Sequence, residues 1–266
     1  MKPAITWRQG VPISLTLAAM MAGFFSILVT VEGMANLNAG QYHLWSAKLI
    51  MLAMILDGLD GIMARKLKGC SEIGAELDTY VDMTAFGIAP ALLIYVVCLP
   101  SQQEWRVLMT AAVVLSGVVR LARFKATDPY RGQMGYSGLP ITACAAWVSL
   151  FIYISQSEPR KAIPWLTQGP VAVIFLMGVL LFIILQVSNV RYPKPTKRPS
   201  LFILSVVLVA LLITPWRHLL ARDPWQRLDI YSAFVMIVLG LGYVICGPLY
   251  LKRVASRAKP GPNGDE

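Results

Sequence analysis

The chain has 266 residues, of which 56% are hydrophobic and only 14% are charged, and its mean hydropathy is +0.61. This composition is typical of a polytopic membrane protein and excludes a soluble globular domain. The net charge of +10 is assigned to loops that face anionic lipid headgroups, so a nucleic acid partner is not needed to explain it.

Apolar stretches of about 20 residues, long enough to cross roughly 30 Å of hydrocarbon, recur along the whole chain. They predict an all-α fold, a polytopic membrane helix bundle with about eight transmembrane helices. The predicted helices cover residues 12–34, 44–65, 76–99, 105–124, 138–156, 169–188, 200–216 and 229–250. The first stretch is expected to be retained as a span, because no small-residue cleavage pattern follows it.

Lysine and arginine residues are distributed unevenly between alternate loops. Seventeen of the 24 fall at the two ends of the chain and in the loops on the same predicted side, and seven fall on the other side. Cytoplasmic loops of membrane proteins carry the excess of positive charge. Both termini, and the acidic segment described next, are therefore predicted on the cytoplasmic side of the inner cell membrane.

Six of the fourteen acidic residues fall between residues 57 and 82. Asp57 and Asp60 are three residues apart, and Asp78 and Asp82 are four apart, so each pair lies on one face of a helix. The basic, polar segment 66–73 suits a short turn between two antiparallel helices. The two pairs are predicted to face each other near the ends of the second and third helices.

Four carboxylates that converge at the edge of a membrane repel one another unless cations are bound. Oxygen ligands favour Mg²⁺ or Mn²⁺ over zinc. Four aspartates are enough to hold two ions if at least one bridges them, as in two-metal sites for phosphoryl chemistry. A cation transporter is the alternative from a different class, but the acids cluster near one surface and no second acidic pair repeats elsewhere in the sequence.

Small residues lie one helical turn from three of these carboxylates, at Gly61, Ala64 and Gly74. They leave room beside the metals for a flat group such as a nucleotide. They equally permit a close contact between helices. The residues by themselves leave both interpretations open.

The acidic segment matches D-x-x-D-G-x-x-A-R-x8-G-x-x-x-D-x-x-x-D at every fixed position and so resembles the CDP-alcohol phosphotransferase family. The matching residues are Asp57, Asp60, Gly61, Ala64, Arg65, Gly74, Asp78 and Asp82. The resemblance implies a membrane enzyme, usually a homodimer, with a six-helix core. It would transfer a phosphatidyl or phospho-alcohol group from a CDP-linked donor to a hydroxyl and release CMP.

The same resemblance implies roles for the matching residues. The four aspartates are expected to bind the metal ions, and Asp82 is also expected to act as the general base. The expected contacts to the donor nucleotide are Asp57, Gly61, Ala64, Arg65, Gly74 and Asp78.

Four flanking segments resemble the membrane-embedded phosphatidylserine synthases. They are D-x-x-x-F-G-x-A-P-A from Asp82, R-L-A-R-F from Arg120, G-L-P from Gly138 and V-S-x-x-R-Y-P from Val187. The resemblance implies CDP-diacylglycerol as donor and L-serine as acceptor. Another member of the family, such as a phosphatidylcholine, phosphatidylglycerophosphate or archaetidylserine synthase, remains an alternative.

Three arginines of one predicted cytoplasmic loop, Arg120, Arg123 and Arg131, are candidates to bind the serine carboxylate or the donor diphosphate. They also fit the positive charge that any cytoplasmic loop carries. In the first helix, Ile13 and Ala19 stand where these synthases are expected to have asparagine, which puts a polar contact to the donor in doubt.

The sequence suggests three parts. Residues 1–198 form the predicted family core, residues 199–252 two additional transmembrane helices, and residues 253–266 a basic cytoplasmic tail. The two additional helices contain no recognisable motif, and packing or lipid contact is the expected role.

Overall fold

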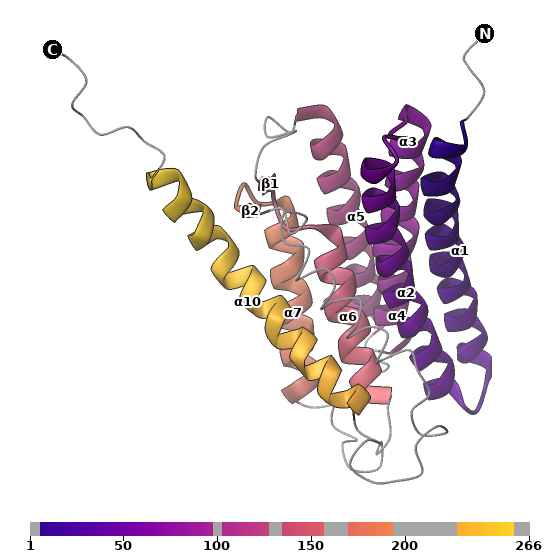
Figure 1. Cartoon of the computed structure of the whole chain (residues 1–266). Helices are drawn as coiled ribbons and strands as arrows, with labels where there is room; N and C mark the ends of the chain where they lie inside the picture. The colour runs from indigo at the N-terminus through magenta and orange to yellow at the C-terminus, as the bar shows by residue number, and fades with distance from the viewer. Residues whose placement is uncertain (1–5, 98–102, 128–134, 157–169, 194–227, 258–266) are drawn as a thin grey trace, which may run out of the picture.

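A computed structural model describes residues 6–97, 103–127, 135–156, 170–193 and 228–257 of the chain. These residues form a bundle of long helices with a short β-ribbon at one end (Figure 1). The helices are α1 (Trp7–Ala35), α2 (Ala39–Lys66), α3 (Glu72–Val81), the π-helix η1 (Asp82–Ile88), α4 (Ala89–Val97), α5 (Gln103–Thr127), α6 (Ile141–Gln156), α7 (Pro170–Val187) and α10 (Leu228–Arg257). The strands are β1 (Gly135–Ser137) and β2 (Arg191–Pro193), which pair antiparallel.

The all-α bundle agrees with the prediction from sequence, and seven of the eight predicted helices are present. The third predicted helix is a continuous rod made of α3, η1 and α4. The predicted helix at 200–216 lies outside the described residues. The total of eight helices and the division of the chain at residue 198 therefore stay predictions, and the two short strands were not predicted.

Four of the described helices are long and apolar enough to cross a membrane: Trp7–Ala35, Glu72–Val97, Glu104–Ala126 and Tyr231–Leu251. Two shorter apolar helices cover Ile141–Gln156 and Ala172–Val187. Large apolar side chains are exposed along these helices, for example Phe24 on α1 and Ile174 on α7. Such surfaces suit contact with lipid, and the chain is a multi-pass membrane protein.

A buried polar cluster joins α1 to α2. Ser26, Thr30 and Ser46 are fully buried, and the Ser46 hydroxyl lies 2.7 Å from that of Ser26 and 2.6 Å from that of Thr30. Each hydroxyl has a hydrogen-bond partner, as buried polar groups require. Small hydroxyl side chains let the two backbones approach closely, and hydrogen bonds between helices stabilise such contacts within a membrane.

At Gly23, helix α1 packs closely against the rod formed by α3, η1 and α4. A Cβ atom on Gly23 would lie only 2.5 Å from the Cβ atom of Ala85 in η1. The wide turns of η1 end just before Pro90, which has no amide hydrogen to donate, and we attribute the local change of helix type to this proline. Packing against α1 thus fixes the rod immediately after Asp82.

Replacing Gly23 by leucine is expected to destabilise the bundle by about 1–3 kcal/mol or more, because the side chain cannot fit between α1 and η1. The measurement is the thermal unfolding midpoint of the purified protein in detergent. Gly10→Leu is the matched control, since a Cβ atom there would meet no described atom within 4 Å apart from neighbouring residues and backbone of its own helix. Equal midpoints for the two variants would contradict this packing.

The elements that carry the predicted site gather at one end of the bundle. The start of α1, the turn between α2 and α3, the end of α5 and the β-ribbon all lie there (Figure 1). The turn packs so closely on the start of α1 that a Cβ atom on Gly69 would lie 2.0 Å from the carbonyl oxygen of Arg8.

Candidate active site

The turn between α2 and α3 brings the two predicted carboxylate pairs together. At the end of α2, Lys68 adopts a left-handed conformation with φ of 53°, and the Gly69 amide donates to the Ala64 carbonyl at 2.9 Å. This is a Schellman ending, which reverses the chain within a few residues. The hydroxyl of Ser71 then caps α3 by accepting a hydrogen bond from the Gly74 amide at 3.0 Å.

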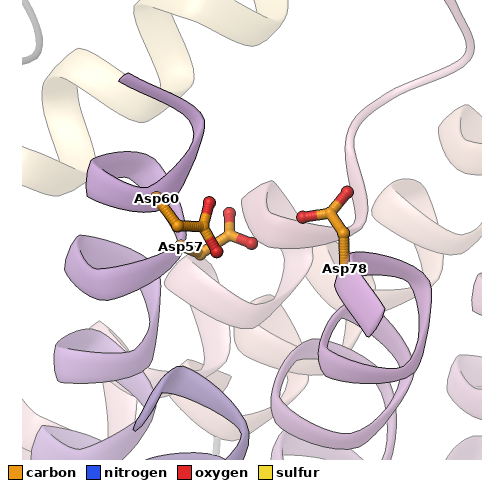
Figure 2. A group of neighbouring side chains, drawn as sticks. All are labelled: Asp57, Asp60 and Asp78. Carbon is orange, nitrogen blue, oxygen red and sulfur yellow. The ribbon is translucent and has the colours of Figure 1, made fainter. Parts of the chain in front are cut away.

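Three of the four predicted aspartates converge across this turn. Carboxylate oxygens of Asp57, Asp60 and Asp78 lie within 4.8 Å of one another, and Figure 2 shows the two residues of α2 facing Asp78 of α3. Asp60 is buried, Asp57 is half-buried and Asp78 is exposed. The group is therefore open on one side and enclosed on the other.

This carboxylate group fits a metal cation. Oxygen Oδ1 of Asp57 is buried, and no described residue forms a hydrogen bond with it. A buried carboxylate oxygen without a donor is costly unless a cation binds it. Three carboxylates at this spacing provide the hard oxygen ligands that Mg²⁺ and Mn²⁺ prefer.

Thr16 on α1 supports the carboxylate group from behind. Its buried hydroxyl lies 2.5 Å from Oδ2 of Asp60 and 2.9 Å from the carbonyl oxygen of Pro12. A hydrogen bond from a hydroxyl to a ligand carboxylate fixes the orientation of that carboxylate. Thr16 was not predicted as a site residue, because its role is apparent only when α1 is packed against α2.

Asp82, the fourth aspartate, lines the same cavity as Asp57 and Asp78. It begins η1 and is not part of the carboxylate group found among the described residues. Its Oδ2 atom is 3.7 Å from a guanidinium nitrogen of Arg120 on α5, and the side chains of the two residues are only 17% and 9% exposed. The fourth aspartate therefore has a cationic partner from another helix.

A cavity of about 450 Å³ adjoins the carboxylates and lies within the range of small-molecule sites. Its walls come from α2, α3, η1, α5 and the start of α6. The lining residues are Asp57, Ala75, Glu76, Asp78, Thr79, Asp82, Arg120, Leu121, Phe124, Lys125, Pro140, Ile141 and Thr142. The cavity thus joins three aspartates on one side to two cations, Arg120 and Lys125, on the other.

The small residues of the signature lie on a different side of the carboxylates. Among the described residues, neither Gly61 nor Gly74 lines the cavity. A Cβ atom on Gly61 would lie 3.5 Å from the Arg65 guanidinium, and one on Gly74 would lie 3.9 Å from the side chain of Ile13. Ile13, which replaces the expected asparagine, therefore places an apolar group beside Gly74.

The three candidate arginines occupy different places. Arg120 lines the cavity. Arg123 donates to the carbonyl oxygen of Val187 and, at 2.6 Å, to the side-chain oxygen of Asn189, so it binds the end of α7. Arg131 lies outside the described residues.

The Arg123 contacts belong to a structural unit at the β-ribbon. Gly138 has a φ of +79°, and a Cβ atom there would lie 2.4 Å from the carbonyl oxygen of Gln186, so glycine is required on both counts. The amides of Gly138 and Leu139 donate to the carbonyls of Val190 and Leu185 at 2.8 and 3.0 Å. Three flanking motifs that are far apart in sequence therefore form one wall, which continues into the cavity-lining residues 140–142.

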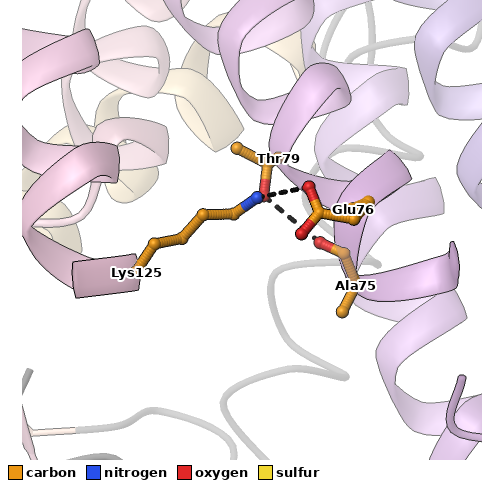
Figure 3. A network of polar contacts seen from close by, with 4 residues as sticks. All are labelled: Ala75, Glu76, Thr79 and Lys125. Atoms are coloured by element: carbon orange, nitrogen blue, oxygen red, sulfur yellow. Dashed lines mark hydrogen bonds and ion pairs between the residues drawn. The ribbon is translucent and has the colours of Figure 1, made fainter. Parts of the chain in front are cut away.

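At the mouth of the cavity, Lys125 forms an ion pair with Glu76. The Nζ to Oε2 distance is 2.6 Å, and both side chains are substantially exposed (Figure 3). In the same view the Thr79 hydroxyl donates to the Ala75 carbonyl at 3.2 Å. Glu76, Thr79 and Thr142 also line the cavity and were not predicted as site residues, since each lies outside the fixed positions of the signature.

Comparison with known proteins agrees with this geometry. Residues 10–185 match the model of the CDP-alcohol phosphatidyltransferase family. The match covers more than half of the chain and contains all four aspartates together with Thr16 and Arg120. The chain belongs to the CDP-alcohol phosphatidyltransferase family, and the resemblance seen in the sequence is confirmed.

Several curated relatives are similar over most of their length. A CDP-diacylglycerol–serine O-phosphatidyltransferase of Helicobacter pylori is 33% identical over 192 residues, which are 71% of this chain and 75% of the relative. The enzyme of that name from Methanocaldococcus jannaschii is 33% identical over 170 residues, 63% and 73% of the two chains. An archaetidylserine synthase of Methanothermobacter thermautotrophicus is 30% identical over 193 residues, 71% and 72%.

Removal of the Thr16 hydroxyl by Thr16→Val is expected to weaken Mn²⁺ binding about 10- to 100-fold, because Asp60 loses the donor that orients it. Titration of the purified protein with Mn²⁺, followed by electron paramagnetic resonance of the free ion, measures this. Thr110→Val is the control, since the Thr110 hydroxyl donates to the Arg106 carbonyl within α5 at 2.7 Å, away from the carboxylate group. Equal affinities for both variants would remove Thr16 from the site.

Proposed function

We propose that the protein transfers the phosphatidyl group of CDP-diacylglycerol to the hydroxyl of L-serine, giving phosphatidylserine and CMP. One observation carries the proposal: the carboxylate group of Asp57, Asp60 and Asp78 adjoins a cavity that also contains Asp82 and Arg120. The printed names of the relatives from Helicobacter pylori and Methanocaldococcus jannaschii support serine as the acceptor.

Asp57, Asp60 and Asp78 would hold the metal ions, and Asp82, one helical turn beyond Asp78, would complete the set of four. Two Mg²⁺ or Mn²⁺ ions, when bound, neutralise the donor diphosphate and stabilise charge on the departing CMP. Thr16 keeps the Asp60 carboxylate oriented toward the group.

The nucleotide of the donor is assigned to the side of the carboxylates where Gly61, Ala64 and Gly74 lie. Among the described residues, and leaving aside the backbone of the same helix, the nearest neighbour of a Cβ atom on Gly61 is the Arg65 guanidinium at 3.5 Å, so there is space beside the carboxylates for a flat base or ribose. Arg65 is exposed and is not one of the residues that line the cavity. Its positive charge suits a phosphate of the donor.

The acceptor is assigned to the 450 Å³ cavity. L-serine carries a carboxylate, which the guanidinium of Arg120 can bind, and Lys125 adds a second positive charge at the mouth. Arg123 has a different role in this proposal, because its guanidinium binds Val187 and Asn189 and so supports the cavity wall. A direct contact of Arg131 with substrate stays a prediction.

In the chemical step, a bond forms between the serine hydroxyl oxygen and the phosphorus of the phosphatidyl group, and the anhydride bond to CMP breaks. The hydroxyl proton passes to the carboxylate of Asp82, which lies in the cavity. Arg120, at 3.7 Å, orients this carboxylate and favours its charged form before the proton arrives. The enclosed walls hold the hydroxyl in line with the phosphorus.

The position of the site suits a lipid donor. The carboxylates lie near the end of the bundle, and the helices around them expose apolar side chains along their length. The acyl chains would therefore remain in the bilayer while the polar headgroup enters the site. We expect the inner cell membrane, with the termini and the site on the cytoplasmic side, and a homodimer as the resemblance implies.

An archaetidylserine synthase is the second candidate, because one relative with that name is 30% identical over 71% of this chain. The name points to the same acceptor. The two candidates differ in their lipid donor, and the experiment described next therefore compares both donors.

The proposed activity predicts CMP release from CDP-diacylglycerol by the purified protein only when serine and Mg²⁺ or Mn²⁺ are present. Inositol, glycerol 3-phosphate and choline are tested in parallel, and the ether-linked archaeal donor is compared with the diacyl donor. Asp82→Asn should lower kcat by about 10²- to 10⁴-fold through loss of the base, with an unchanged unfolding midpoint. CMP release that needs no serine, or release with another acceptor alone, would refute the assignment.

The expected orientation can be checked at the native cysteine Cys70, which is free and exposed in the turn between α2 and α3. In a variant that keeps Cys70 as its sole cysteine, an impermeant maleimide should label inside-out membrane vesicles and not right-side-out vesicles. A sole cysteine at the exposed position Leu37, in the connection at the opposite end of α1, should give the reverse pattern. Labelling of Cys70 from the outside would place the site on the other face.

A further inference from the structure

Helix α10 lies beyond the residues that match the family model, which end at residue 185. Its C-terminal half packs on strand β2 (Figure 1). The Tyr243 hydroxyl donates to the carbonyl oxygen of Pro193 at 2.9 Å, and its ring lies 5.7 Å from that of Tyr192. Gly247 is buried there, and a Cβ atom on it would lie 3.0 Å from the ring of Pro193.

Strand β2 connects this contact to the cavity. Its residues pair with β1, so that Tyr192 lies opposite Tyr136 and Pro193 lies opposite Gly135. Strand β1 leads through Gly138, whose amide bonds to Val190, into the segment 140–142 that lines the cavity. The contact with α10 is thus transmitted to the wall by a short and continuous path of hydrogen-bonded backbone.

The β-ribbon needs such support. Each strand has only three residues, and an isolated two-stranded ribbon is marginally stable at best. Arg123 holds one end of the ribbon through Val187 and Asn189, whereas α10 contacts the other end at Tyr192 and Pro193. Without the second contact, the ribbon would be held from one end only.

We propose that α10 is a positioning element for the acceptor pocket, in which Tyr243 and Gly247 hold the β-ribbon and, through it, the cavity wall at 140–142. This inference rests on the proposed function, because it assigns the cavity to the acceptor. Neither residue touches a reacting atom.

The two ends of α10 have separate anchors. Near its start, Ala233 is fully buried in a cluster with Met51 of α2 and Leu150 and Tyr153 of α6. A change at Gly247 can therefore displace the C-terminal half of the helix while the other half stays in the bundle. The carboxylates on α2 and α3, which hold the donor, are attached to other helices.

The test replaces Gly247 by leucine and compares it with Gly240→Leu on the same helix, where the added Cβ atom would meet no described atom within 4 Å apart from neighbouring residues and backbone of α10. Gly247→Leu should raise the KM for serine about tenfold, as expected for loss of roughly 1.4 kcal/mol of binding. The KM for CDP-diacylglycerol should change less than about twofold, and Gly240→Leu should resemble the unmodified protein. A general packing defect would instead affect both substrates and kcat alike.

Tyr243→Phe, which removes the hydroxyl that donates to Pro193, should raise the KM for serine about two- to tenfold. Tyr231→Phe, at an exposed position of the same helix, is its control. Equal effects of each variant and its control on the KM for serine, or equal effects on the KM of both substrates, would overturn the proposal.

Amide hydrogen exchange tests the support of the ribbon by α10 independently of which acceptor the enzyme uses. Gly247→Leu should speed exchange of the Gly138 and Leu139 amides, which bond to Val190 and Leu185, whichever acceptor the enzyme uses. Unchanged exchange of these amides would refute the support by α10. If another acceptor proves to be the substrate, the serine assignment fails, and the same KM comparison is made with that acceptor.

Discussion

The structure depends on one electrostatic constraint: several carboxylates are held together at the edge of an apolar helix bundle. Such a group is unfavourable unless cations bind it and surrounding donors orient it. The tight turn after α2, the capped start of α3 and the hydroxyl of Thr16 all serve to keep Asp57, Asp60 and Asp78 at short distance. The packing of α1 against α2 and η1 is, in this sense, part of the candidate metal site.

The cavity walls opposite the carboxylates are built differently. Its cationic side comes from α5, and its remaining wall comes from residues that a short β-ribbon places at the start of α6. The side that we assign to the donor is made of consecutive helices, whereas the side that we assign to the acceptor is assembled from segments that are distant in sequence. This division suits a family in which different members share a donor chemistry and differ in the acceptor.

The sequence predicted the helices and the carboxylates well because both are local properties. Apolar length predicts a span, and a spacing of three or four residues places Asp57 with Asp60 on one helical face. Thr16, Glu76 and Thr142 were not assigned, because their place depends on which helices pack together. The pairing of Asp82 with Arg120 and the contacts of Arg123 likewise depend on the tertiary arrangement of α5, η1 and α7. The ribbon was missed because three-residue strands leave too short a pattern to detect.

The pairing of β1 with β2 joins residues that are more than fifty positions apart, since Tyr136 lies opposite Tyr192. Chains are inserted into the membrane as they are synthesised, from the N-terminus onward. The carboxylates of α2 and α3 can therefore meet while most of the chain is still to be made, whereas the wall of the cavity waits for residue 193. A nascent chain therefore passes through a stage in which these carboxylates can be close together before the cavity wall is complete.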